Sequence, residues 1–452
     1  MVKTAFRRCA LAALLLATLL SGCASFDADR IRSGQTADFT NRLAAASAEL
    51  LAQPLTLDES IAIALTNNYE VRKADIDRNL ALLGRKTAFA AFLPQVSAAA
   101  GYNAFDKDPK TSSRRFETEE ISVGMPIFMP STWFLYEAAK HGFAAGEISA
   151  NYARQSIVLK TTDAFCNVLI QQDVVRATAA QLDAARQNAD RVRGLAGEGL
   201  VTKWEGEQAA YLAESRLVQL HQAERRLAVL RAQFLAVLGL APNADFTLVP
   251  PAEPMTPDDD ETVEGLVAFA LANHPLLSLS DREVAAKESG VRQAFCGLIP
   301  TATLFGRQSW SGNEVMTVSP NLVTGFNAAW DVFSGVTIAK YKASKAELEK
   351  SRLERENTFL TVIVNVVSAE AAWRDALEAK AIAKRAFDVA SEKYADYDAR
   401  SREGLVPLAD ALDALAAKDL AQVELVKLTY AERTAKAALD FATGKTVFAK
   451  ED

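Results

Sequence analysis

The chain has 452 residues, of which 50% are hydrophobic and 24% charged, and its formal net charge is −7. By length it can bury a large core and would hold about two to four domains. Its acidic balance leaves no basic patch, which excludes the usual nucleic-acid-binding classes, so we expect no nucleic acid among its partners.

Residues 1–22 have the pattern of a secretory signal peptide, because positive charges precede an apolar run over residues 10–20 that is too short to cross a membrane. Residues 20–23 read Leu-Ser-Gly-Cys and resemble a bacterial lipobox, which implies that Cys23 is acylated and becomes the first residue of the mature protein. An ordinary signal peptide with an incidental cysteine is the alternative. No aspartate follows the cysteine, which by the same resemblance favours delivery to the outer membrane. The lipidated lead, residues 23–56, shows no readable fold.

Helical periodicity begins at Leu57 and predicts a helix that ends near Phe92, before Pro94. After this proline the period changes to two over about residues 95–128, which predicts a β-hairpin with strands of about ten residues. Such strands can cross a bilayer when tilted. A soluble hairpin is the alternative, and the secretion and lipid signals favour the membrane. Aromatic residues gather near the strand ends of both predicted hairpins: Phe105, Phe128, Trp133, Phe134, Trp310, Trp330 and Phe333.

A very long helix is allowed over residues 132–197, since no proline occurs between Pro130 and Pro242. It would extend about 100 Å, far more than one membrane. A helix over residues 200–238 follows. Placed end to end, this helix and the one that begins at Leu57 match the long helix in length. Each hairpin would therefore stand on an antiparallel helical rod.

The chain contains this unit twice. Residues 64–94 recur without a gap 206 positions later, and Gly199-Leu200-Val201 recurs as Gly404-Leu405-Val406 at an offset of 205. The expected domains are the signal peptide (1–22), the lipidated lead (23–56), repeat 1 (57–240), a proline-rich linker (241–262), repeat 2 (263–444) and a C-terminal tail (445–452).

Repeat 2 is expected to contain a first helix over about residues 261–298 and a hairpin over about residues 301–333. Its last helix carries apolar residues every seven positions, the spacing of a seam packed knobs-into-holes, at Ala414, Ala421, Leu428, Ala435 and Ala442. Cys166 and Cys296 lie at non-equivalent places in the two repeats, so we expect buried thiols and no disulfide.

Four strands cannot close a barrel, because the smallest membrane barrels have eight and an open edge is not tolerated in lipid. The barrel must then be shared between chains. Two chains would supply eight strands and three would supply twelve, which leaves room for a lumen. Periodicity does not choose between them.

A series of short motifs occurs in order along the chain: Leu57-Asp58-Glu59, the turns at 64–68 and 270–274, Leu93-Pro94, Ile299-Pro300, Pro126-Ile127-Phe128, Asp331-Val332-Phe333 and the two Gly-Leu-Val segments. On these motifs the chain resembles the TolC-type outer membrane efflux proteins over about residues 57–444. The resemblance implies an α+β membrane protein, a homotrimer whose twelve-stranded outer-membrane β-barrel continues into a long periplasmic α-helical barrel. It implies a passive exit duct for efflux or type I secretion that works with a periplasmic adaptor protein, an inner-membrane pump of the resistance-nodulation-division or ATP-binding type, and outer-membrane lipid.

The same resemblance implies two functional places at the end of the rods. The Gly-Leu-Val segments would contact the adaptor: Gly199, Leu200, Val201, Gly404, Leu405 and Val406. Asp410 and Asp413, three residues apart on one helix face, would ring the periplasmic aperture, with Glu205 and Gln208 at the corresponding places of repeat 1. On the residues alone, a solvated helix start is the alternative.

A lipid-anchored periplasmic helical scaffold without a pore is the rival function. We expect no enzyme, since His141, His221 and His274 are dispersed and no nucleophile elbow, phosphate-binding loop or metal-ligand spacing occurs. No cofactor or metal is expected, and the transported substrate stays open.

Overall fold

The computed structural model describes residues 28–107, 112–251, 262–313, 315, 321–403 and 405–445. Its helices are α2 (Ala28–Leu50), α3 (Leu57–Asn67), α4 (Tyr69–Ala90), α5 (Pro130–Gly197), α6 (Lys203–Leu238), α7 (Val263–Asn273), α8 (Pro275–Cys296), α9 (Gly335–Arg402) and α10 (Leu408–Thr443). Its strands are β1 (Gln95–Ala104), β2 (Arg115–Phe128), β3 (Thr301–Ser311) and β4 (Asn321–Ala329).

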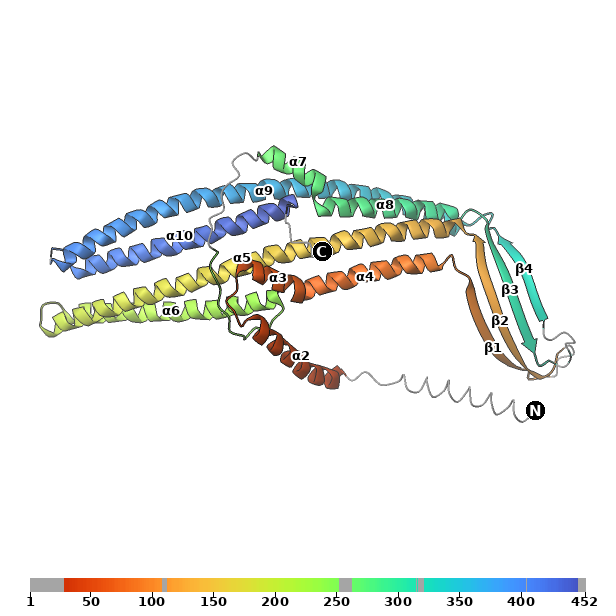
Figure 1. Ribbon diagram of the computed structural model, residues 1–452, viewed down its shortest axis with the longest axis horizontal. Coiled ribbons are helices and arrows are strands. Elements are labelled where there is room, and N and C mark those ends of the chain that lie inside the picture. Colours follow the sequence, from red (N-terminus) through yellow and green to blue (C-terminus); the bar gives the residue numbers. More distant parts are fainter. Residues whose placement is uncertain are drawn as a thin grey trace.

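The helices of the second half repeat those of the first at fixed displacements. Helices α3 and α4 return as α7 and α8, and α5 and α6 return as α9 and α10 with the same lengths of 68 and 36 residues. The 68-residue helices extend about 100 Å. In Figure 1 the α5/α6 and α9/α10 pairs form one end of the molecule, while α4 and α8 continue toward the sheet at the other end. Helix α5 lies at the centre and packs against α4, α6, α8 and α10.

The single helix expected from Leu57 to Phe92 is wrong, because the chain breaks at Asn68. This residue takes an extended conformation and caps α4, its Oδ1 accepting a hydrogen bond from the Glu70 amide at 2.7 Å. Its Nδ2 donates to the carbonyl of Val237 at 2.7 Å, which ties the break to the end of α6. A side chain with one capping bond and one tertiary bond therefore interrupts the helical periodicity.

The helix expected over 261–298 is interrupted at the equivalent position, His274. Its neutral Nδ1 accepts from the Leu276 amide at 3.2 Å, and Pro275 opens α8. The His274 side chain is buried, and this burial lowers its pKa. The stretch Val263–Cys296 is long and apolar enough by composition to cross a membrane, but it bends here and packs along α9.

One hydrophobic core lies where α6 ends against the break in the first repeat, and a second surrounds the equivalent break in the second repeat. Phe165, Phe234 and Leu238 are fully buried in the first core. Gly239 closes α6 with φ +72°, and a Cβ on it would lie 2.5 Å from the carbonyl oxygen of Asn67, so only glycine fits. Helix α2, for which the sequence offered no fold, is attached here by Ser47, whose Oγ accepts from the Ala241 amide at 2.9 Å.

The two cysteines within the described residues, Cys166 and Cys296, are buried free thiols, as expected. Burial raises the pKa of Cys166 to about 12. Neither thiol is therefore poised to react.

The four strands form one antiparallel sheet in the order β1-β2-β3-β4. Strands β2 and β3 join the two hairpins, with Thr118 opposite Ser311 at one end and Met125 opposite Leu304 near the other. A register shift between Pro126 and Phe128 marks the end of β2 next to the helices. The sheet lies at one end of the long helices, and its strands run at a steep angle to the helix axes (Figure 1).

Candidate functional site

The sheet carries its apolar side chains on the exposed face. Along β2, exposed and half-buried residues alternate, and the exposed ones include Ile121, Val123, Met125 and Ile127, with 40 to 57% of each residue accessible. Since directly paired residues share a face, the register extends this surface over all four strands. Its other exposed apolar members are Val96, Tyr102, Leu304, Leu322 and Phe326.

The opposite face of the sheet is mainly polar, although Phe305 and Val323 also lie on it. The hydroxyls of Ser97 and Ser122 lie 2.8 Å apart across β1 and β2. Arg307 Nε lies 3.3 Å from a carboxylate oxygen of Glu120 across β2 and β3. A water-soluble sheet buries its apolar face, whereas here the apolar face is exposed and is backed by a mainly polar one.

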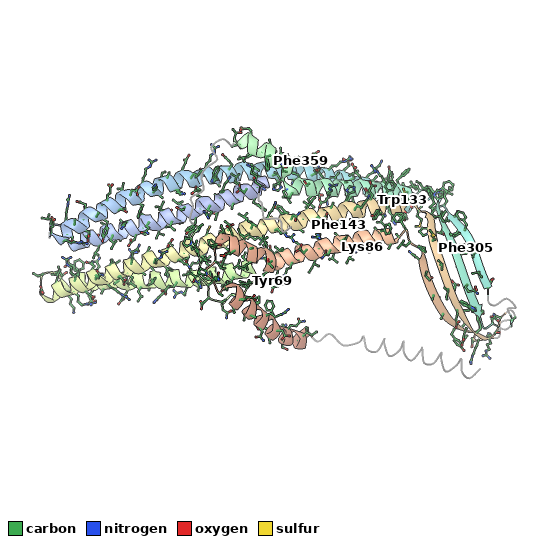
Figure 2. The ribbon with its side chains drawn as sticks, viewed as in Figure 1. Tyr69, Lys86, Trp133, Phe143, Phe305 and Phe359 are labelled. Carbon is green, nitrogen blue, oxygen red and sulfur yellow. The ribbon has the colours of Figure 1, made fainter. Side chains whose placement is uncertain are left out.

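Aromatic side chains mark both ends of this apolar surface. Trp310 lies near the far end of β3 and pairs with Glu119. Trp133 lies where the helices meet the sheet (Figure 2), and Trp330 nearby donates its indole N–H to the carbonyl of Leu298 at 3.1 Å. Two aromatic levels with an apolar band between them are typical of a membrane-embedded sheet.

The lateral edges of the molecule are unpartnered in the single chain. Strands β1 and β4 each have one neighbour in the four-stranded sheet that the structure describes. On the helices adjoining the sheet, exposed apolar residues recur along α4 and α9 at spacings of three, four or seven residues. This is the spacing of a coiled-coil seam, and in the single chain the seam has no partner. These residues are Ile76, Leu80 and Leu83 on α4 and Leu353, Leu360, Val364 and Val367 on α9.

The helix pairs end in two tips, which contain the predicted Gly-Leu-Val segments. Gly199 has φ +74°, and the amide of Leu200 donates back to the carbonyl of Leu195 at 2.9 Å. The equivalent bond in the second tip joins Leu405 to Arg400, also at 2.9 Å. Leu200 and Leu405 are strongly exposed, whereas Val201 and Val406 are half-buried. Gly404, like Cys23, lies outside the described residues.

The two tips lie next to each other. Arg191 of α5 lines one cavity of about 680 Å³ together with Leu405 and Val406 of the second tip. Arg402 and Asp398, which form an ion pair at 2.6 Å, complete its wall. At the tips, the apolar side chains of Leu405 and Val406 thus lie next to charged side chains.

The four predicted aperture residues divide into two kinds. Glu205 closes a capping box, because its carboxylate accepts from the Thr202 amide and hydroxyl, each at 2.7 Å. These hydrogen bonds lower the pKa of Glu205. Gln208, Asp410 and Asp413 are exposed, and within the described residues neither aspartate forms an ion pair.

No group of three or more histidine, cysteine, aspartate or glutamate side chains within the described part of the chain is arranged to hold a metal ion.

Sequence reasoning missed the unpartnered seams. A heptad count over α6 and α9 would have revealed them, since Trp204, Tyr211 and Val218 follow one another at intervals of seven, as do Ile382 and Val389. All five side chains are exposed in the single chain.

Known proteins resemble this chain both in sequence and in fold. The family model described as "Outer membrane efflux protein" matches residues 61–240 and 266–445. Outer membrane protein TolC of Escherichia coli strain K12 is 26% identical over 137 residues, and the matched part spans 30% of this chain and 28% of TolC.

Two solved structures share the fold over most of their length. The Campylobacter jejuni CmeC outer membrane channel superposes with a TM-score of 0.74 at 18% identity, covering 88% of this chain and 87% of CmeC. The outer membrane protein VceC of Vibrio cholerae gives a TM-score of 0.69 at 16% identity, covering 86% of this chain and 96% of VceC.

Proposed function

Because the chain belongs to the outer membrane efflux protein family, we propose that it is the outer-membrane exit duct of a tripartite efflux or type I secretion system. It conducts substrates passively from a periplasmic adaptor and an inner-membrane pump of the resistance-nodulation-division or ATP-binding type to the exterior, with no chemical step and no cofactor. The polarity of the sheet carries this proposal. A lipid-facing apolar band around a polar interior is what a membrane barrel requires.

The duct is a homotrimer. A strand of ten residues tilted by about 40° spans about 25 Å, the height of the apolar band in outer-membrane barrels. The open edges of β1 and β4 must be paired in lipid, and one chain supplies only four strands. Three chains give twelve strands and a lumen, whereas two would give eight, whose interior side chains fill.

The helices form the periplasmic part of the duct. Repeat 1, residues 57–240, and repeat 2, residues 263–444, each contribute one hairpin and one helical rod. Helices of 68 residues carry the lumen about 100 Å away from the membrane. The apolar seams on α4 and α9 close the helical barrel between neighbouring chains.

The tips meet the adaptor and limit the flow. The exposed leucines at 200 and 405 are the adaptor-contacting groups, supported by their neighbours in the two Gly-Leu-Val segments. Asp410 and Asp413 give six carboxylates around the axis of a trimer, and Gln208 lies at the same level. Such a ring attracts cations to the entrance. Glu205 belongs to this level but is restrained by its capping box.

A lipid on Cys23 anchors the chain to the outer membrane. The lipobox-like residues 20–23 support this. Replacing Cys23 with alanine should abolish incorporation of a radioactive fatty acid. Labelling that persists in the variant would show that Cys23 does not carry the lipid.

Complementation tests the function. In a Gram-negative strain that lacks its own exit duct, co-expression of this chain with a matching adaptor and pump should restore export of the pump's substrate. A pore-free periplasmic scaffold would leave export absent although the chain reaches the outer membrane fraction. That outcome would reject the duct.

A further inference from the structure

Helices α5 and α10 of one chain pack together along a seam whose register is well defined. Asp173 and Ala180 of α5 line a cavity of about 230 Å³ with Asp419 and Val423 of α10. Val426 of α10 lines the same cavity as Asp173, and Tyr430 lies one helical turn beyond Val426 and is half-buried. Burial and the charge of Asp173 both raise the pKa of the tyrosine. The seam therefore aligns each α5 position with known positions of α10.

The same faces recur on the outer edges of the chain without a partner. Helix α9 repeats α5, and α6 repeats α10, but α6 and α9 lie on opposite sides of the molecule (Figure 1). Val218 of α6, the equivalent of Val423, is 52% exposed, and Ile382 of α9 is 65% exposed. In a closed ring, α6 of each chain meets α9 of its neighbour. Because the two repeats have the same geometry, this contact should copy the register of α5 with α10.

Transferring that register brings opposite charges together. The position of Asp173 becomes Glu378 on α9, and the position of Tyr430 becomes Arg225 on α6. Both side chains are exposed in the single chain. A carboxylate next to a phenol within the chain is thus replaced by a carboxylate next to a guanidinium between chains.

A second pair arises two to three helical turns nearer the tip. The position of Ala180 becomes Arg385, and that of Asp419 becomes Glu214, and both are exposed. Between the two pairs the transferred register places an apolar contact, since Ile382 takes the position of Ala177 and Val218 takes that of Val423. Two complementary charge pairs around an apolar contact form the pattern of a specific coiled-coil seam.

We propose that neighbouring subunits of the duct are joined along α6 and α9 by this charged seam, with Glu378 facing Arg225 of the partner subunit and Arg385 facing Glu214 of the partner subunit. The occupant of the exposed α6 stripe is therefore a second copy of this chain. The inference rests on the proposed ring and adds its subunit register.

Charge reversal tests the register. Glu378→Arg alone and Arg225→Glu alone should each lower the trimer-to-monomer ratio of the full-length protein in detergent by about fivefold, because like charges then face each other. The double variant should restore the wild-type ratio. Arg226→Glu is the matched control, since it lies on the same helix one position away and should not rescue Glu378→Arg.

A cysteine pair gives a second readout that needs no loss of stability. Val218→Cys combined with Ile382→Cys should form disulfide-linked dimers and trimers on addition of copper phenanthroline, which takes up the electrons of the two thiols, and each single variant should not. If the protein is trimeric but shows neither rescue nor cross-linking, the proposed seam between α6 and α9 is wrong, while the proposed exit duct is unaffected. A protein that is monomeric in every variant and in the wild type would overturn both.

Discussion

Replacing Val123 with arginine places a charge near the middle of the exposed apolar face of the sheet. Val123 lies between Ile121 and Met125 in the outward row of β2, and its cross-strand partners are Val96 and Gly306. No polar residue of that face lies directly opposite it to receive a guanidinium.

The expected cost depends on the solvent around the sheet. An arginine at the midplane of a bilayer destabilises a barrel by about 2–4 kcal/mol per chain, which is about 30-fold to several hundredfold in the folding equilibrium. The same change on a water-exposed sheet stays within about 0.5 kcal/mol. The magnitude therefore distinguishes a lipid-facing surface from a solvated one.

The assay is urea denaturation of the protein in lipid vesicles, followed by the fluorescence of the tryptophans near the sheet. The control is Ser309→Arg, because Ser309 lies on the polar face opposite Glu120 and should accept a cation with little loss. Equal denaturation midpoints for Val123→Arg and wild type, or a larger loss for Ser309→Arg, would refute the assignment of the faces.

Three further changes test the helices and the tip. Gly239→Ala should cost more than about 2 kcal/mol, because its φ of +72° and the 2.5 Å approach of the new Cβ to the Asn67 carbonyl both oppose a side chain; thermal unfolding followed by circular dichroism measures this. Because burial lowers the pKa of His274, stability should be complete above about pH 6.5 and fall as the pH drops below it. His274→Asn, which installs the residue of the first repeat, should remove that acid sensitivity, and an unchanged pH profile would contradict the role of the cap. Asp410→Ala with Asp413→Ala should weaken the preference of the channel for cations in reversal-potential measurements. An unchanged preference would show that these two aspartates do not line the aperture.

The long helices could be predicted because their limits are set locally. Proline bounds α5 at its start, and the left-handed Gly199 follows its end. The break at Asn68 could not, since it depends on a side chain that caps the next helix and also bonds to a carbonyl 169 residues away. The break at His274 has a local signal in Pro275, which the helix expected over residues 261–298 did not take into account. Tertiary hydrogen bonding at Asn68 overrides an uninterrupted helical period.

The candidate site was predictable to a different degree at its two ends. The alternation in β2 predicts that the two faces of the sheet differ in polarity. Which residues of the neighbouring strands share each face became clear only from the register with β1 and β3. At the tip, the spacing of Asp410 and Asp413 was readable, whereas the capping role of Glu205 follows from its contact with Thr202. The exposed stripes of α6 and α9 are readable from their spacing of seven residues. The register between them is not, because it is taken from the packing of α5 with α10, which no local pattern specifies.

Conductance of the purified full-length protein in a planar lipid bilayer tests the central claim most directly. A duct open through the sheet and the helical rods should produce discrete, stable current steps at fixed voltage. Protein that is folded, trimeric and inserted in the bilayer but gives no current steps would contradict the account.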